Sequence, residues 1–141
     1  MKKNIILLIE DDQLDVISVE RSLSKLEMEY ELFTAFNGIE GLTLLREKLQ
    51  TNEPLPEVIL LDLNMPKMNG IEFLKELRNN EQLKHLNVFV MTTSGEEADR
   101  KAADQLGVSG YVIKPLNFNN NGKRRDSMDA FVQFHLRKLF T

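Results

Sequence analysis

Five short runs of consecutive hydrophobic residues lie along the chain. They cover residues 4–10 (NIILLIE), 30–36 (YELFTAF), 57–62 (EVILLD), 87–92 (NVFVMT) and 110–114 (GYVIK). All five are rich in branched or aromatic residues, and this composition predicts β-strands. Because the runs are continuous rather than alternating, we expect a parallel sheet that is covered on both faces.

The segments between these runs have the hydrophobic spacing of helices. They are residues 13–26, 38–49, 70–79 and 96–106, and a fifth helix is predicted at about 126–139. Strand and helix thus alternate along the chain, and right-handed crossovers then predict a doubly wound α/β fold with helices on both faces of the sheet. Such folds bind ligands beyond the carboxyl ends of their strands.

The last helix has a single hydrophobic stripe with the spacing i, i+3, i+4, i+7, i+8 and i+11. Its members are Met128, Phe131, Val132, His135, Leu136 and Leu139. The stripe predicts one buried face and makes His135 a packed core or interface residue rather than a ligand. Phe134 and Phe140 lie off the stripe, where they either pack against a partner or cover the edge of the domain. A polar and basic loop, residues 117–126, precedes this helix.

Length and composition narrow the class of protein. A chain of 141 residues fits one domain, residues 1–141, with its core at about 3–116. The apolar run near the N-terminus is too short for a signal peptide or a membrane span, so we expect a cytoplasmic protein. The chain has no cysteine, which excludes disulfides and thiolate chemistry. The formal net charge of −4 gives no reason to expect direct DNA binding or generic nucleic-acid binding.

Residues with metal-binding or phosphate-binding side chains stand where the predicted strands end. They are Glu10, Asp11 and Asp12 after the first strand, Asp62 on the third, Thr92 on the fourth and Lys114 on the fifth. Parallel strands deliver their carboxyl ends to one edge, so we expect these side chains to meet. Carboxylates this close together need a cation, and oxygen ligands with room for water and phosphate suit Mg²⁺. A carboxylate between that cation and a lysine can act as a nucleophile toward a phosphoryl group.

Structural roles are the alternative for each of these residues. Asp11 or Asp12 can cap the following helix. Asp62 can begin the turn in NMPKMNG, Tyr111 can be a half-buried strand residue, and Lys114 can be an ordinary lysine at a strand end. The gathering of acid, hydroxyl and lysine at four strand ends favours the chemical interpretation.

Four motifs in this order resemble the receiver domain of two-component response regulators, and in particular its stand-alone, chemotaxis-type members. The motifs are IEDD after the first strand, LLDLNMPKMNG around Asp62, MTTS at Thr92 and YVIKP at Lys114. The resemblance covers residues 3–116 and continues less specifically into the last helix. It implies a flavodoxin-like, five-stranded parallel sheet with strand order 2-1-3-4-5.

The resemblance also implies roles for individual residues. Asp62 would be the phosphoacceptor, and Lys114 would contact the phosphoryl group. Asp11 would bind Mg²⁺ directly, Glu10 would bind it through water, and the backbone carbonyl of Asn64 would complete the protein ligands together with Asp62.

Further residues would govern the response to phosphorylation. Thr92 and Tyr111 would form a switch pair that biases the face made by the fourth helix, the fifth strand and the last helix. Asn64 and Ser94 would border the attacking water and tune the lifetime of the phosphoryl group. A cis peptide is expected before Pro115.

The function that follows is a phosphorylation-activated signalling switch. A histidine kinase or a phosphotransfer protein would supply the phosphoryl group, and a downstream protein would recognise the phosphorylated form. The chain would catalyse only its own phosphorylation and dephosphorylation, so we do not class it as an enzyme. Homodimerisation through the last helix stays open, as does the placement of that helix, because the loop at 117–126 is longer and more basic than is typical of the family.

Three other functions compete with this one. A haloacid dehalogenase-type hydrolase needs an acid two residues after its nucleophile, and Asn64 is not an acid. A flavin- or nucleotide-binding module needs a phosphate-binding loop after the first strand, where EDDQLD would repel phosphate. A scaffold of the same fold, whose acidic pocket is never phosphorylated, stays open.

Overall fold

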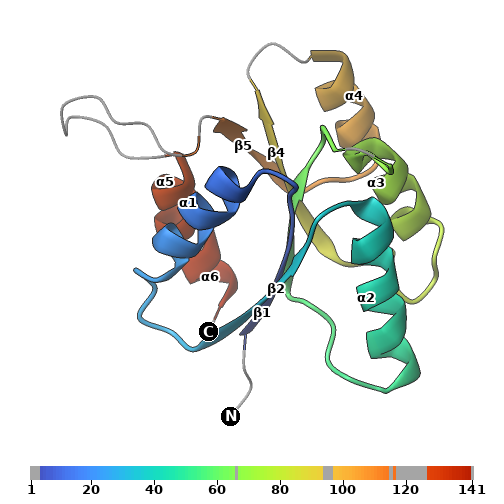
Figure 1. The fold of residues 1–141 in the computed structure, drawn as a ribbon, viewed down its shortest axis with the longest axis horizontal. Coiled ribbons are helices and arrows are strands. Elements are labelled where there is room, and N and C mark those ends of the chain that lie inside the picture. Colours follow the sequence, from blue (N-terminus) through green and yellow to red (C-terminus); the bar gives the residue numbers. More distant parts are fainter. Residues whose placement is uncertain (1–3, 66, 94–96, 115, 117–126, 141) are drawn as a thin grey trace.

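A parallel sheet of five strands lies between two layers of helices (Figure 1). The computed structural model describes residues 4–65, 67–93, 97–114, 116 and 127–140. The strands are β1 (Asn4–Ile9), β2 (Tyr30–Ala35), β3 (Val58–Asp62), β4 (Asn87–Thr93) and β5 (Gly110–Lys114). All pairs are parallel and the order is β2-β1-β3-β4-β5, so the expected doubly wound fold and strand order are confirmed.

The helices follow the predicted segments closely. They are α1 (Gln13–Leu23), α2 (Gly38–Gln50), α3 (Gly70–Arg78), α4 (Glu97–Gln105), α5 (Ser127–Phe131), the π-helical segment η1 (Val132–Leu136) and α6 (Arg137–Leu139). Helices α1, α5 and α6 cover one face of the sheet, and α2, α3 and α4 cover the other (Figure 1). None of the described helices is long and apolar enough to cross a membrane.

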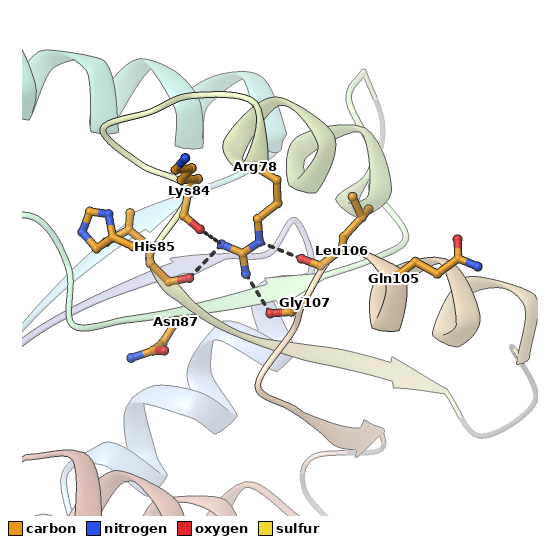
Figure 2. A pocket seen from close by; sticks show the side chains of 8 residues that line it. Arg78, Lys84, His85, Asn87, Gln105, Leu106 and Gly107 are labelled. Carbon is orange, nitrogen blue, oxygen red and sulfur yellow. Dashed lines mark hydrogen bonds between the residues drawn. The ribbon is translucent and has the colours of Figure 1, made fainter.

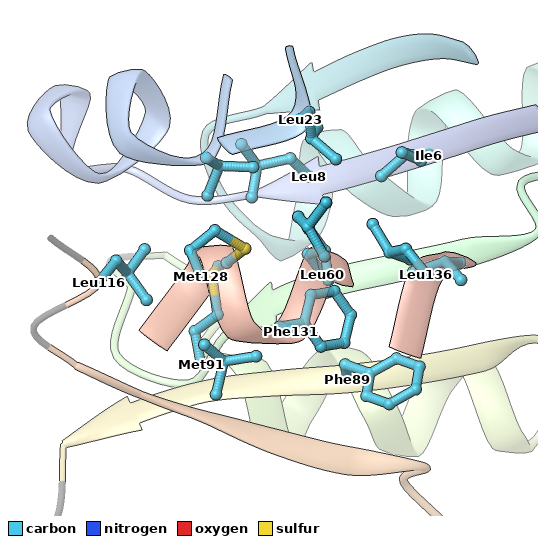
Figure 3. Close-up of a cluster of buried hydrophobic side chains, with 14 of the residues drawn as sticks. Ile6, Leu8, Leu23, Leu60, Phe89, Met91, Leu116, Met128, Phe131 and Leu136 are labelled. Atoms are coloured by element: carbon cyan, nitrogen blue, oxygen red, sulfur yellow. The ribbon is translucent and has the colours of Figure 1, made fainter. Parts of the chain in front are cut away.

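Each strand contributes side chains to two separate cores because successive residues of a strand point to opposite faces. Ile6 and Leu8 face α1 and α5, whereas Leu7 and Ile9 face α2 and α3. Figure 3 shows the first of these cores, in which side chains from the sheet meet Met128, Phe131 and Leu136 of the last helix. The last helix is therefore an integral part of the fold.

The stripe predicted for the last helix is only partly correct. Met128, Phe131, Val132 and Leu136 are buried as expected, but His135 is exposed and Leu139 is 40% exposed. Phe140, which lies off the predicted stripe, is 1% exposed. The reason is the π-helical turn over Val132–Leu136, because a wider turn accommodates an extra residue and shifts the buried face.

The His135 ring is nevertheless packed on one side. Its centroid lies 5.6 Å from that of the Phe131 ring and 5.9 Å from that of the Phe89 ring. His135 is therefore an exposed residue at the rim of the hydrophobic core. Of the two environments predicted for it, the core is wrong, and an interface stays a prediction.

Arg78, the last residue of α3, joins two loops at the opposite end of the sheet from the carboxylates. Its guanidinium donates hydrogen bonds to four backbone carbonyl oxygens, those of Leu106 (2.6 Å), Lys84 (2.9 Å), Leu86 (2.9 Å) and Gly107 (3.0 Å). Figure 2 shows this arrangement. The same residues line a pocket with a volume of about 390 Å³. The end of α3, the loop into β4 and the turn after α4 are thereby held together.

Candidate functional site

Three carboxylates gather where β1 and β3 end. Glu10 follows β1, Asp62 is the last residue of the adjacent β3, and Asp11 is the next residue after Glu10. Each of the three side chains has a carboxylate oxygen, and these three oxygens all lie within 4.8 Å of one another. Glu10 is 1% exposed and Asp62 is 3% exposed, whereas Asp11 is open to solvent. The predicted gathering of acidic residues is therefore present.

Lys114, at the end of β5, points into this cluster. Its Nζ atom lies 3.0 Å from Oε1 of Glu10 and 3.5 Å from Oδ1 of Asp62. Its shortest ion pair, at 2.8 Å, is with Oδ2 of Asp15 on α1. The lysine thus balances part of the buried negative charge, which would otherwise cost several kcal/mol.

Burial and charge shift the pKa values of these groups in the ways expected for a crowded acidic site. Burial raises the pKa of Glu10 to about 8, helped by the hydrogen bond and charge of Asp62 and opposed by Lys114. Burial also raises the pKa of Asp62, against the lowering effects of Glu10, Lys114 and the Asn64 N–H. Burial disfavours the Lys114 ammonium, but the bond to Asp15 and the charges of Asp62 and Glu10 outweigh it and raise its pKa.

The backbone after β3 fixes the position of Asp62. Its Oδ1 atom accepts a hydrogen bond from the backbone N–H of Asn64 at 3.1 Å. The start of α3 is pressed against the same turn, because a Cβ atom on Gly70 would come within 2.7 Å of the Asp62 carbonyl oxygen. Asn69 caps α3 through a reciprocal pair of hydrogen bonds with Glu72. Only glycine fits at this contact between helix and strand.

The donor set suits a hard divalent cation. Among the residues that the structure describes, this group consists of three carboxylates and contains no nitrogen or sulfur ligand, a combination typical of Mg²⁺, Mn²⁺ or Ca²⁺. Within the described part of the chain, the buried Oε1 atom of Glu10 accepts no hydrogen bond of normal geometry, although it is ion-paired with Lys114. A divalent cation would compensate the charge that a single lysine leaves unbalanced.

Asp12 takes the structural role that was its alternative. Its side chain accepts a hydrogen bond from the Leu14 N–H at 2.9 Å and so caps α1, and its own N–H donates to Oε2 of Glu10 at 3.2 Å. Asp12 therefore positions the start of α1, and Asp11 remains available for a metal ion.

The expected switch residues lie on the neighbouring strands. Thr92 on β4 is 1% exposed. It is paired with Ile113 of β5, the residue that precedes Lys114. Tyr111 is half-buried, and its hydroxyl donates to the Arg100 carbonyl oxygen at 2.9 Å and is hydrogen-bonded to the Asp104 carboxylate. The Arg100 guanidinium lies 4.6 Å from the centre of the Tyr111 ring. The ring is therefore held against α4.

This contact also affects the ionisation of the phenol. Burial raises the pKa of Tyr111 to about 12, together with the hydrogen bond and charge of Asp104 and against the effect of Arg100.

Some expected residues fall outside the described part of the chain. These are Ser94, Pro115 and the loop at 117–126. Asp15, in contrast, was not anticipated from the sequence, although it makes the shortest ion pair with Lys114. An acid in the first turn of a helix is common for reasons of helix polarity alone, so nothing in the sequence linked it to a lysine 99 positions later.

A family model describes this arrangement of fold and site. The model of the response regulator receiver domain matches residues 6–123. The chain belongs to this family. Receiver domains are the signalling switches of two-component systems.

Individual relatives agree with the family assignment. The chain is 35% identical over 128 residues to response regulator Rcp1 of Synechocystis sp.. The aligned region covers 90% of this chain and 87% of Rcp1. It resembles the crystal structure of the Mn²⁺-bound form of Rcp1, with a TM-score of 0.77 and 32% identity over 93% of each chain. It also resembles the phosphorylated cyanobacterial phytochrome response regulator RcpA, with a TM-score of 0.82, 30% identity and coverage of 97% and 96%.

Proposed function

We propose that this receiver domain is switched by transfer of a phosphoryl group to Asp62, with Mg²⁺ as the metal. The observation that carries the proposal is the position of the Asp62 carboxylate, which is buried at the end of β3 between the acidic pair of Glu10 and Asp11 and the Lys114 ammonium. The Mn²⁺-bound and phosphorylated structures of two relatives support it.

In this mechanism each side chain of the site has a distinct task. Asp11 and Asp62 would bind the metal directly, as would the carbonyl oxygen of Asn64, and Glu10 would act through water. When bound, Mg²⁺ would supply positive charge against the oxygens of the transferring phosphoryl group. Lys114 leaves its carboxylate partners to contact the phosphoryl group from the other side.

Phosphorylation would then be read at the face formed by α4, β5 and α5. The Thr92 hydroxyl donates to a phosphoryl oxygen, and the Tyr111 ring leaves Asp104 for the space that this movement opens. A pocket of about 250 Å³ lies between β5 and the last helix on this face, lined by Tyr111, Phe134 and His135 among others. A change in the Tyr111 ring would therefore alter a surface that a protein partner can contact.

The remaining assignments rest on the family alone. Ser94 and Asn64 would tune the lifetime of the phosphoryl group, and a cis peptide would precede Pro115. The phosphoryl donor would be a histidine kinase or a phosphotransfer protein. The phosphorylated form would be recognised by a downstream protein or by a second copy of the chain. The protein would be cytoplasmic.

The test is the intact mass of the protein after incubation with acetyl phosphate and Mg²⁺. We expect the wild-type protein to gain the mass of one phosphoryl group. The gain should not occur when EDTA is added before acetyl phosphate, and it should not occur in Asp62→Asn. Asp12→Ser is the matched control, because it removes a carboxylate from the same region and keeps a good helix cap. No gain in the wild-type protein, or an equal gain in Asp62→Asn, would reject Asp62 as the phosphoacceptor.

A further inference from the structure

We infer that Asp15 is a positioning residue that holds Lys114 away from Asp62 and so slows phosphorylation. This inference rests on the phosphoryl transfer proposed above. The key observation is the order of the three distances from Lys114 Nζ, which are 2.8 Å to Asp15, 3.0 Å to Glu10 and 3.5 Å to Asp62. The lysine is therefore closest to the one carboxylate among the three that belongs neither to the proposed metal site nor to the reaction.

The location of Asp15 lets it compete for the lysine without taking part in the chemistry. It lies in the first turn of α1, where the helix dipole favours a negative side chain. It is absent from the group of carboxylates whose oxygens could share a metal ion. Its side chain is 20% exposed and that of Lys114 is 16% exposed, so the pair is partly shielded from water and stronger than a surface ion pair.

The competition matters because the reaction needs Lys114 at the phosphoryl group. A carboxylate oxygen of Asp62 forms a bond to phosphorus while the bond from phosphorus to the leaving oxygen of acetyl phosphate breaks, and acetate departs with the electron pair. Lys114 must leave Asp15 before it can stabilise the charge on the transferring oxygens. The ion pair lowers the free energy of the starting state, and it is lost in the transition state, so it raises the barrier.

Hydrolysis of the aspartyl phosphate should respond differently. Once Asp62 is phosphorylated, Lys114 has already moved to the phosphoryl group in both the starting state and the transition state. Asp15 then affects the two states equally. The ion pair between Asp15 and Lys114 thus slows phosphorylation of Asp62 and leaves the lifetime of the aspartyl phosphate unchanged.

The experiment compares rates of phosphorylation by acetyl phosphate with Mg²⁺, followed by intact mass, in the wild type and in Asp15→Asn. Loss of a partly shielded ion pair predicts a rate about threefold to tenfold higher in the variant. Hydrolysis after removal of the donor should stay within about twofold of the wild type. Asp15→Glu, which keeps the charge, should return phosphorylation toward the wild-type rate.

Two controls separate an effect through Lys114 from a general effect of charge on an anionic donor. Asp12→Ser removes the same charge from the start of α1 without touching Lys114, and it should leave the rate near that of the wild type. In a Lys114→Gln background, Asp15→Asn should no longer change the rate.

Several results would overturn the inference. These are an unchanged or lower phosphorylation rate in Asp15→Asn, an equal acceleration by Asp12→Ser, and an acceleration that persists without Lys114. If the wild type itself gains no phosphoryl group, the proposed function fails and this inference fails with it. If the wild type is phosphorylated and Asp15→Asn is not faster, only the role of Asp15 is rejected.

Discussion

Replacing Arg78 with methionine tests how the end of the sheet opposite the carboxylates is held together. Methionine keeps much of the aliphatic stem but removes a guanidinium that donates to four carbonyl oxygens, two in the loop between α3 and β4 and two in the turn after α4. No sequence pattern pointed to this residue, because its partners are all backbone atoms.

The expected loss of stability can be worked out from these four bonds. Hydrogen bonds to charged groups contribute more than neutral ones, but the pocket around Arg78 admits water, which would partly satisfy the freed carbonyls. At roughly 0.5 to 1 kcal/mol for each bond, we expect the free energy of unfolding to fall by about 2 to 4 kcal/mol. For a domain of this length that corresponds to a fall in melting temperature of about 6 to 16 °C.

The assay is urea denaturation followed by far-ultraviolet circular dichroism, with thermal melting as a second measure. Arg78→Lys should recover part of the loss, since an ammonium keeps the charge but cannot reach four carbonyls in a planar fork. Lys75→Met, at an exposed position in the last turn of the same helix, is the matched control for loss of one positive charge. An unfolding free energy for Arg78→Met within about 0.5 kcal/mol of the wild type would refute the reasoning.

Three further predictions concern other parts of the molecule. Because Phe140 is buried and Leu139 is exposed, Phe140→Ala should lower the unfolding free energy by about 3 to 5 kcal/mol and Leu139→Ala by less than about 1 kcal/mol. Urea denaturation measures both values, and the reverse order would reject the register that the π-helical turn sets. Asp104→Asn should lower the pKa of Tyr111 from about 12 toward its ordinary value, as measured by ultraviolet absorbance titration, and an unchanged midpoint would show that Asp104 does not govern the phenol. The raised pKa of Glu10 gives a contribution to metal-free stability that is complete below pH 4.5 and is lost as the pH rises through about 8. Because metal binding must displace that proton, Mg²⁺ should raise the melting temperature more at about pH 8.5 than at about pH 6.5, and equal shifts would contradict the shifted ionisation.

The sequence by itself determined the fold class and most of the site. Continuous hydrophobic runs at 4–10 and 57–62 specify strands that must be covered on both faces, and the alternation with helices specifies parallel strands. Once the strands are parallel, their ends meet at one edge. The convergence of Glu10, Asp62 and Lys114 was therefore predictable from local patterns alone.

Only the tertiary structure decided which contacts these residues make. Either Asp11 or Asp12 could cap the following helix as far as the local sequence shows. In the structure the turn after β1 leaves the Asp11 side chain exposed to solvent and places Asp12 at the cap of α1. The last helix carries a regular stripe, yet packing against the sheet through a π-helical turn buries Phe140 and exposes His135. Periodicity assumes a constant rise and twist, and it cannot detect a single widened turn.

The same distinction applies to Asp15 and Arg78. Both are polar residues on helices, where local sequence gives them ordinary roles, and both have partners far away along the chain in the folded protein. An ion pair or a hydrogen bond depends on distances of about 3 Å and on side-chain direction. Those are fixed only when helices and sheet are packed together, so the sequence specifies which groups reach the edge of the sheet and the packing decides which of them pair.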